Sequence, residues 1–454
     1  MITIRNRLLF PAPLLEDIRR RLFADEPYEA ACVVLARATA TPRGALRFIA
    51  SDAMFAEPSD YIVQSSDRVE LTAEFMARAA RRARDEKFSL FVTHTHPRAH
   101  RVGPSYVDRS SEEQWAPAVS RRITPGYAGR IILGRAVAHA AVLTAQQVIP
   151  LRIVEVGDRV VIEADGALGD ADPIQQIHDR QVRAFGAAGQ RVLRELCVAI
   201  VGLGGTGSVV AEQLAHLGVG ELILIDPDRI EASNLNRVVG AMLSDVGIPK
   251  VDVAADFVRR ISPTTQVIPS TGDIQDAAQL RALLDTDFFF CCTDSDGSRA
   301  VLNQLAYQFL VPGIDLGVAI RSKAGVVTRI VGRVQMLTPS QPCLLCAEVL
   351  DSEQVRRDLM TVDERARDRY IVDEVVPQPA VVSLNATASS MAVTMMLSAF
   401  TGIPMASRYQ LLRFDSGVVS RATVERAPLC PVCSPYGTRC KGDLFPFPGR
   451  LGGV

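Results

Sequence analysis

A glycine-rich loop between two short apolar runs constrains the fold of this chain more than any other feature. The run Cys197–Val201 is typical of a buried strand, and it leads at once into Gly202-Leu-Gly-Gly-Thr-Gly-Ser. A helical pattern then extends to Leu217, and Glu221–Asp226 has the pattern of a second strand that ends in an acid. This order predicts an α/β fold with a doubly wound, mostly parallel, Rossmann-like sheet.

The loop itself predicts a nucleotide site. Glycines let the backbone turn tightly and approach a phosphate, whose charge then lies at the N-terminus of the following helix. Asp226 ends the next strand, where a carboxylate can accept hydrogen bonds from ribose hydroxyls. Taken alone, these residues fit any mononucleotide or dinucleotide, including the cofactor of an NAD-dependent oxidoreductase.

Charged residues farther along the chain favour a nucleoside triphosphate. Arg237 and Lys250 follow Asp226, and cations that converge on a glycine loop suit the several charges of a triphosphate. Another buried-strand pattern, Phe288–Cys292, is followed by Asp294, whose carboxylate could hold Mg²⁺ against a polyphosphate. We therefore expect ATP and Mg²⁺ at this edge of the sheet.

From Arg180 to Cys433 the chain resembles the ThiF/MoeB and ubiquitin-activating adenylyltransferase family. The motifs that carry the resemblance are DRQV, GLGGTGS, LIDPDRIEASNLNR, GIPK, CCTDSD and two Cys-x-x-Cys pairs. The resemblance implies that the C-terminal glycine of a ubiquitin-like, β-grasp protein is converted to an acyl-adenylate, with release of pyrophosphate. It implies a nucleotide-binding set made of Gly202, Gly204, Gly205, Gly207, Asp226, Asp228, Asn234, Arg237, Lys250 and Asp294.

The same resemblance assigns catalytic roles. Arg237 and Lys250 would contact the phosphates, Asp294 would ligate Mg²⁺, and Arg180 would be supplied across the interface of a homodimer. A carboxylate is already a nucleophile at neutral pH, so the implied catalysis is positioning and charge neutralisation.

Four of the nine cysteines form two pairs, Cys343 with Cys346 and Cys430 with Cys433. Thiolate pairs of this spacing predict a structural Cys₄ site for Zn²⁺, provided that the fold brings them together.

One departure from the family leaves the acyl acceptor open. Relatives that form a thioester carry a cysteine after the first zinc pair, whereas Ala347 to Met391 contains none. The adenylate could pass directly to the thiol of a conjugating enzyme, or to a loop hydroxyl such as that of Ser383. A sulfur-carrier adenylyltransferase, served by a sulfur donor, is the alternative reading.

A histidine cluster precedes the glycine loop by about a hundred residues, within a first block of the chain. His94 and His96 occupy alternate positions of a strand pattern, so they point the same way and can share one metal ion. Asp108 would complete a His₂Asp set that leaves one position open to water, and Glu29 could deprotonate that water. Ser105 could donate a hydrogen bond to the developing oxyanion.

The glutamate, the His-x-His-Pro motif and the Ser-x-x-Asp motif resemble the JAB/JAMM metallopeptidase family. The resemblance implies a second, catalytic Zn²⁺ and cleavage of peptide or isopeptide bonds after ubiquitin-like tails, which would trim or release the modifier. A degenerate domain that only docks the substrate protein is the alternative, and a scaffold with both sites vestigial is a third reading. Chains that fuse the two families resemble bacterial ubiquitin-like conjugation components.

Length and composition complete the expectations. The 454 residues predict a small α+β JAB-like domain over 1–150, a linker over 151–175, a ThiF-like domain over 176–437 and a tail over 438–454. The net charge of −1 argues against nucleic-acid binding, and no apolar run predicts a signal peptide or a membrane helix. We therefore expect a cytoplasmic homodimer whose partners are a ubiquitin-like protein and a conjugating enzyme or sulfur donor.

Overall fold

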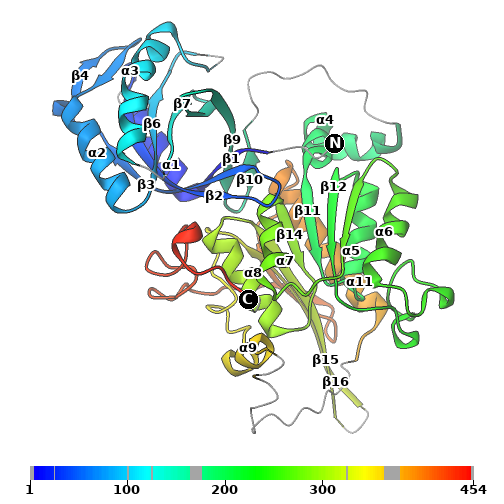
Figure 1. Cartoon of the computed structure of the whole chain (residues 1–454). Coiled ribbons are helices and arrows are strands. Elements are labelled where there is room, and N and C mark those ends of the chain that lie inside the picture. Colours follow the sequence, from blue (N-terminus) through cyan, green and yellow to red (C-terminus); the bar gives the residue numbers. More distant parts are fainter. Residues whose placement is uncertain are drawn as a thin grey trace. The chain divides into compact units, whose positions relative to one another are not determined.

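The computed structural model describes residues 5–24, 26–99, 102–123, 126–163, 176–323, 326–361, 364 and 379–450 (Figure 1). The chain divides into two compact units. The first holds residues 1–172 together with Gln308–Leu310 and Cys440–Pro446, and the second holds the rest. Within the described ranges, no helix has the length and apolar character that crossing a membrane requires.

The first unit is built on an eight-stranded sheet in the order β1-β3-β2-β6-β7-β8-β9-β10. Strand β1, at one end of this order, pairs in parallel with both β3 and β9, so the sheet is curved and closes on itself. The elements of this unit are β1 (Arg7–Pro11), α1 (Ala12–Leu22), β2 (Ala31–Ala40), β3 (Leu46–Phe55), β4 (Tyr61–Gln64), β5 (Val69–Leu71), α2 (Ala73–Asp85), β6 (Ser89–Thr95), α3 (Tyr106–Arg122), β7 (Ala128–Leu133), β8 (Ala138–Leu143), β9 (Val148–Val156) and β10 (Val160–Ile162). Strands β4 and β5 form a separate hairpin.

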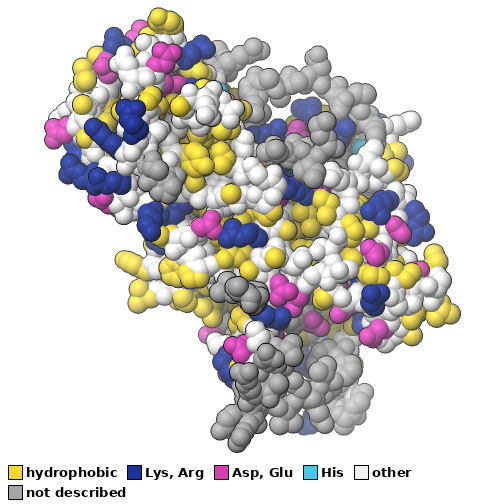
Figure 2. Space-filling model, in the orientation of Figure 1, with side chains coloured by type: hydrophobic (Ala, Val, Ile, Leu, Met, Phe, Trp, Pro, Cys, Tyr) yellow, Lys and Arg dark blue, Asp and Glu magenta, His cyan; other side chains and the backbone are white. Residues whose placement is uncertain are grey.

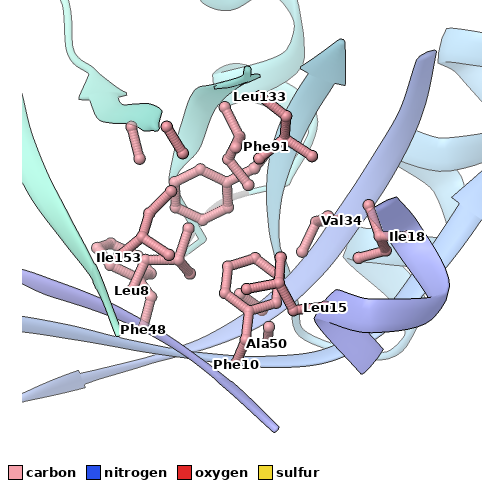
Figure 3. Close-up of a cluster of buried hydrophobic side chains, with 14 of the residues drawn as sticks. Leu8, Phe10, Leu15, Ile18, Val34, Phe48, Ala50, Phe91, Leu133 and Ile153 are labelled. Atoms are coloured by element: carbon pink, nitrogen blue, oxygen red, sulfur yellow. The ribbon is translucent and has the colours of Figure 1, made fainter. Parts of the chain in front are cut away.

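Aliphatic and aromatic side chains fill the curled sheet (Figure 3). Leu15 and Ile18 are three residues apart on α1, so both face the strands and are buried. The rings of Phe48 and Phe91 pack edge to face with their centroids 5.1 Å apart. This core holds β2 and β6 in place, and the candidate metal ligands His94 and His96 lie at the end of β6.

Part of the expected linker is strand. Residues 151–162 were expected in a connector, but they belong to β9 and β10 of the first sheet. The turn of this hairpin lies at Gly157, whose N–H donates to the Arg159 carbonyl at 2.9 Å. The remainder of the expected linker, residues 164–175, lies outside the described residues.

Part of the expected tail is packed as well. Cys440 is buried, and its carbonyl oxygen accepts a hydrogen bond from the Ser51 hydroxyl at 2.9 Å. The Arg47 guanidinium, which is 2% exposed, donates to the carbonyl oxygens of Phe309 and Leu310 at 3.2 and 3.0 Å. The first unit is therefore completed by segments from much later in the sequence, which local composition does not reveal.

The second unit contains another eight-stranded sheet, in the order β13-β12-β11-β14-β15-β16-β17-β18. The five strands from β13 to β15 in this order are parallel, and β16, β17 and β18 continue the sheet antiparallel. The prediction of a mostly parallel α/β sheet is confirmed. The strands are β11 (Cys197–Val201), β12 (Glu221–Ile225), β13 (Gln266–Ser270), β14 (Phe288–Cys291), β15 (Gly313–Lys323), β16 (Val326–Leu337), β17 (Tyr409–Arg413) and β18 (Val418–Arg421).

The helices of the second unit are α4 (Asp179–Glu195), α5 (Gly207–Leu217), α6 (Lys250–Ile261), α7 (Ala277–Ala282), α8 (Asp296–Gln308), α9 (Ser352–Leu359) and α11 (Val382–Phe400). In the register of the parallel strands, Val201 of β11 lies opposite both Ile225 of β12 and Cys291 of β14. The residues that follow these three strands therefore meet at one edge of the sheet, where parallel sheets commonly bind ligands.

Candidate functional site

The glycine loop leads from β11 into α5, and one part of it faces open space. Gly202 has a φ of 88°, and a Cβ atom there would lie 2.8 Å from the carbonyl oxygen of Cys292. Only glycine satisfies both the backbone conformation and this close approach. A Cβ at Gly204 would meet nothing within 4 Å. The loop thus packs against the end of β14 at Gly202 and leaves room for a ligand at Gly204.

Asp226 is fixed next to this loop by backbone donors. One carboxylate oxygen accepts a hydrogen bond from the Leu203 N–H at 2.6 Å, and the other accepts from the Asp228 N–H at 2.8 Å. Burial raises the pKa of the Asp226 carboxyl, while the positive charge of Lys250 acts in the opposite direction. The carboxylate is therefore oriented before any ligand arrives.

Lys250 begins α6 and reaches back toward the same edge. Its Nζ lies 2.7 Å from the Asp228 carboxylate and 3.9 Å from the Asp226 carboxylate. The lysine side chain is 11% exposed, whereas that of Asp228 is 64% exposed. The ammonium group is thus held near the loop by one accessible carboxylate, which a phosphate could replace as its partner.

Arg237 and Asn234 belong to the irregular segment after β12. The guanidinium of Arg237 donates to the carbonyl oxygen of Ser233 at 2.6 Å, and its Cβ would lie 3.4 Å from a Cβ at Gly205. The side-chain oxygen of buried Asn234 accepts a hydrogen bond from the Glu231 N–H at 3.1 Å. Asn234 therefore shapes the turn that brings Arg237 to the loop.

Asp294 lies three residues after the end of β14, and β14 pairs with β11. Its side chain is exposed, so it is accessible to an ion at this edge. The glycine loop, Asp226 and Asp294 thus follow neighbouring strands at this edge, and Gly207 starts α5. Arg180 is exposed on the first turn of α4, and its role across a dimer interface stays a prediction.

Sequence reasoning missed the contribution of α11, which lies beside α5 (Figure 1). The Ser389 hydroxyl donates to the carbonyl oxygen of Thr206 in the loop at 3.0 Å, and Gln213 of α5 donates to the Ser390 hydroxyl at 2.7 Å. Asn385, one turn before Ser389, packs against Gly205. Polar residues recur along the whole of α11, so no signal in the sequence singles out Asn385 and Ser389.

The two cysteine pairs meet, as predicted. The sulfurs of Cys343 and Cys430 are 3.5 Å apart, as are those of Cys346 and Cys433, and all four lie within 4.8 Å of one another. Tetrahedral Zn²⁺ with bonds of about 2.3 Å separates its sulfurs by about 3.8 Å, so the cluster fits this ion. A hydrogen bond from the Cys343 thiol lowers the pKa of Cys433 to about 5, which favours a thiolate.

We expect Cys433→Ser to lose one equivalent of zinc and to lower the melting temperature by about 10 °C, because metal-binding energy at such a site is folding energy. Elemental analysis and calorimetry measure the two effects. Cys197→Ala is the matched control, since Cys197 is a buried thiol outside the cluster in the same unit. Unchanged zinc content in Cys433→Ser would contradict the assignment.

The histidine cluster of the first unit also converges. The Nε2 atoms of His94 and His96 are 3.1 Å apart, and the Asp108 carboxylate lies 3.3 Å from the first and 3.6 Å from the second. Glu29, which precedes β2, has a carboxylate oxygen 3.7 Å from His96 Nε2. Ser105 caps α3, and its N–H donates to the Asp108 carboxylate at 2.7 Å.

The electrostatics of this cluster separate its two acids. Burial raises the pKa of Glu29 to about 7, against the influence of His94. Burial also acts to raise the pKa of Asp108, but hydrogen bonds from His94 and Ser105 outweigh it and leave the pKa below its usual value. One acid is thus suited to bind an ion and the other to take up a proton near neutral pH.

A cavity of about 390 Å³ opens beside His94 and Asp108. Its apolar lining includes Ile62 of β4, Met76 of α2 and Trp115 of α3. Such a mixture of apolar walls and a few polar groups is common in sites that hold a peptide side chain or a small ligand.

Comparison with known proteins matches residues 178–432 to the ThiF family. The molybdopterin-synthase adenylyltransferase of Salmonella typhimurium is 33% identical over 180 residues, which cover 39% of this chain and 69% of that enzyme. The SAMP-activating enzyme E1 of Haloferax volcanii is 32% identical over 161 residues, which cover 36% of this chain and 56% of that enzyme. The structure of Escherichia coli MccB with ATP aligns over 57% of this chain and 75% of its own, at 20% identity and a TM-score of 0.46.

The region that matches the ThiF family contains the candidate nucleotide site. Residues 178–432 include the glycine loop, Asp226, Lys250 and Asp294, and reach into the second cysteine pair at Cys430. They make up more than half of the sequence, and the chain therefore belongs to the ThiF family.

Proposed function

We propose that the second unit activates the C-terminal carboxylate of a ubiquitin-like, β-grasp protein as an acyl-adenylate. The observation that carries the proposal is the arrangement of Asp226 and Lys250 beside the open face of the loop at Gly204. An adenylyltransferase and an activating enzyme among the relatives support the same reaction class.

The chemistry needs positioning more than proton transfer. The acyl carboxylate forms a bond to the α-phosphorus of ATP, and the bond from that phosphorus to pyrophosphate breaks. Lys250 and Arg237 would neutralise the charge that collects on the phosphates, and Asp226 would hold the ribose. Asp294 would hold Mg²⁺, whose positive charge would offset that of the phosphates.

The fate of the adenylate defines two versions of the proposal. In the first, a conjugating enzyme or another thiol takes the acyl group, and in the second a sulfur donor converts it to a thiocarboxylate. Ser383 is exposed on the first turn of α11 and stays a candidate acceptor. Mass spectrometry of the modifier after reaction separates a protein conjugate from a thiocarboxylate.

ATP–pyrophosphate exchange tests the proposal, with small β-grasp proteins that end in glycine as acyl substrates. We expect exchange that requires both the acyl protein and Mg²⁺. Asp294→Asn should raise the Mg²⁺ concentration for half-maximal exchange about tenfold, because one anionic ligand is lost while the shape is kept. Exchange with an unchanged Mg²⁺ requirement in Asp294→Asn would contradict the role of this residue.

We infer a second activity for the first unit, the hydrolysis of a peptide or isopeptide bond after the modifier tail. The convergence of His94, His96 and Asp108 on a point beside Glu29 supports it. The donor set of two imidazoles and one carboxylate suits Zn²⁺ with a position left for water. When bound, zinc would supply Lewis acidity, and Glu29 would take the proton from the attacking water.

A further inference from the structure

Helix α11 places one buried carboxamide directly on the glycine loop. A Cβ at Gly205 would lie 2.3 Å from Asn385 Nδ2 and 3.3 Å from Asn385 Cγ. The side chain of Asn385 therefore occupies the space that any larger residue at position 205 would need. Asn385 is 7% exposed, although it lies only one turn into the helix.

This carboxamide has no hydrogen-bond partner within the part of the chain that the structure describes, although the Asn385 backbone N–H bonds to Val381. The next polar residue on the same face, Ser389, does have one, in the carbonyl oxygen of Thr206. The amide of Asn385 keeps a small accessible surface, so a ligand can reach it and replace water as its hydrogen-bond partner.

The surroundings of Asn385 identify the ligand as an anion. Gly204, adjacent to the glycine it covers, faces open space, and Arg237 approaches the same glycine with its Cβ. Helix α5 begins two residues after Gly205, and its N-terminus favours negative charge. An N–H donor beside a helix N-terminus suits phosphate oxygens, and Arg237 adds positive charge from a side chain whose Cβ approaches the same glycine.

We propose that Asn385 Nδ2 donates a hydrogen bond to a phosphate oxygen of the bound nucleotide. This inference rests on the proposed adenylation for the identity of the nucleotide, ATP. The bonds from Ser389 to Thr206 and from Gln213 to Ser390 hold α11 against the loop and α5, so the amide is in place before binding. Asn385 is then a phosphate-binding residue supplied by a helix that follows the loop by nearly two hundred positions.

The test compares ATP with adenosine, which has no phosphate, by calorimetric titration of the full chain. Asn385→Leu keeps the size of the side chain and removes the donor, so we expect ATP to bind about tenfold more weakly and adenosine to bind as before. Asn385→Asp should weaken ATP binding further, because its carboxylate would face the phosphates. Thr387→Ala is the control, since Thr387 is exposed on the same helix.

Two results would overturn the inference. The first is an unchanged affinity of Asn385→Leu for ATP, and the second is an equal loss for ATP and adenosine, which would indicate a packing role alone. The proposed adenylation fails separately, if wild-type protein binds ATP but catalyses no pyrophosphate exchange with any acyl protein. Wild-type protein that binds no ATP would overturn both.

Discussion

Replacing Lys250 with methionine is expected to lower kcat/KM for ATP–pyrophosphate exchange by about 10²- to 10³-fold. The ammonium group lies in a mostly water-excluded position beside the loop, where a fixed charge stabilises developing negative charge far better than solvent does. Methionine keeps most of the length of the side chain and removes the charge. Steady-state exchange assays at saturating Mg²⁺ measure the effect.

The fold should tolerate this change. Asp228, the nearer ionic partner of Lys250, is exposed enough to be hydrated once the lysine is lost. Lys323→Met is the matched control, because Lys323 is an exposed lysine on β15, and its exchange rate should equal that of the wild type. A Lys250→Met protein with wild-type exchange would remove this residue from the mechanism.

The second large effect is expected in the first unit, where Glu29→Gln should slow peptide hydrolysis by about 10²- to 10⁴-fold. Glutamine has the same shape but cannot take up the proton of the attacking water. The substrate is a β-grasp protein extended by a short C-terminal peptide, and cleavage is followed by mass spectrometry. Zinc content should not change, because the predicted ligands are His94, His96 and Asp108.

In this experiment, zinc analysis distinguishes whether Glu29 acts as a general base or as a zinc ligand. If Glu29→Gln lost zinc together with activity, Glu29 would act through the metal and not as a base. Glu74→Gln is the control, since Glu74 is exposed on the first turn of α2 and should leave hydrolysis unchanged. If wild-type protein did not cleave any such extension, the docking role would replace the peptidase proposal.

The sequence predicted the sheet of the second unit and the residues at its edge. Apolar runs and a glycine loop are local signals, and each corresponds to an observed element. The meeting of the two cysteine pairs was also predictable, because a shared ion needs all four thiolates. These features depend on the types of residues present and on their short-range order.

Contacts between distant segments were not predictable in the same way. The composition of α11 is that of any buried helix, so neither Asn385 nor Ser389 is distinguishable as a neighbour of the loop. Residues 151–162 were placed in a connector because the run from Gly157 to Pro173, which is rich in glycine and aspartate, has the composition of one. In both cases the position of a side chain or a turn is determined by tertiary packing, which the local sequence does not specify.

Figure 2 shows how charged side chains are distributed over one face of this protein, whose net charge is only −1. Lysine and arginine side chains are interspersed there with aspartate and glutamate side chains. Charge alone therefore does not mark a binding site on this face.

The first unit is discontinuous in sequence, and this limits how the chain can be divided. A recombinant fragment that stopped at residue 172 would lack Phe309 and Leu310, whose carbonyl oxygens accept hydrogen bonds from the nearly inaccessible Arg47. A buried guanidinium deprived of acceptors is strongly destabilising. The two units therefore cannot be separated by one cut in the chain, because removing the second unit would also remove residues 308–310 and 440–446 of the first.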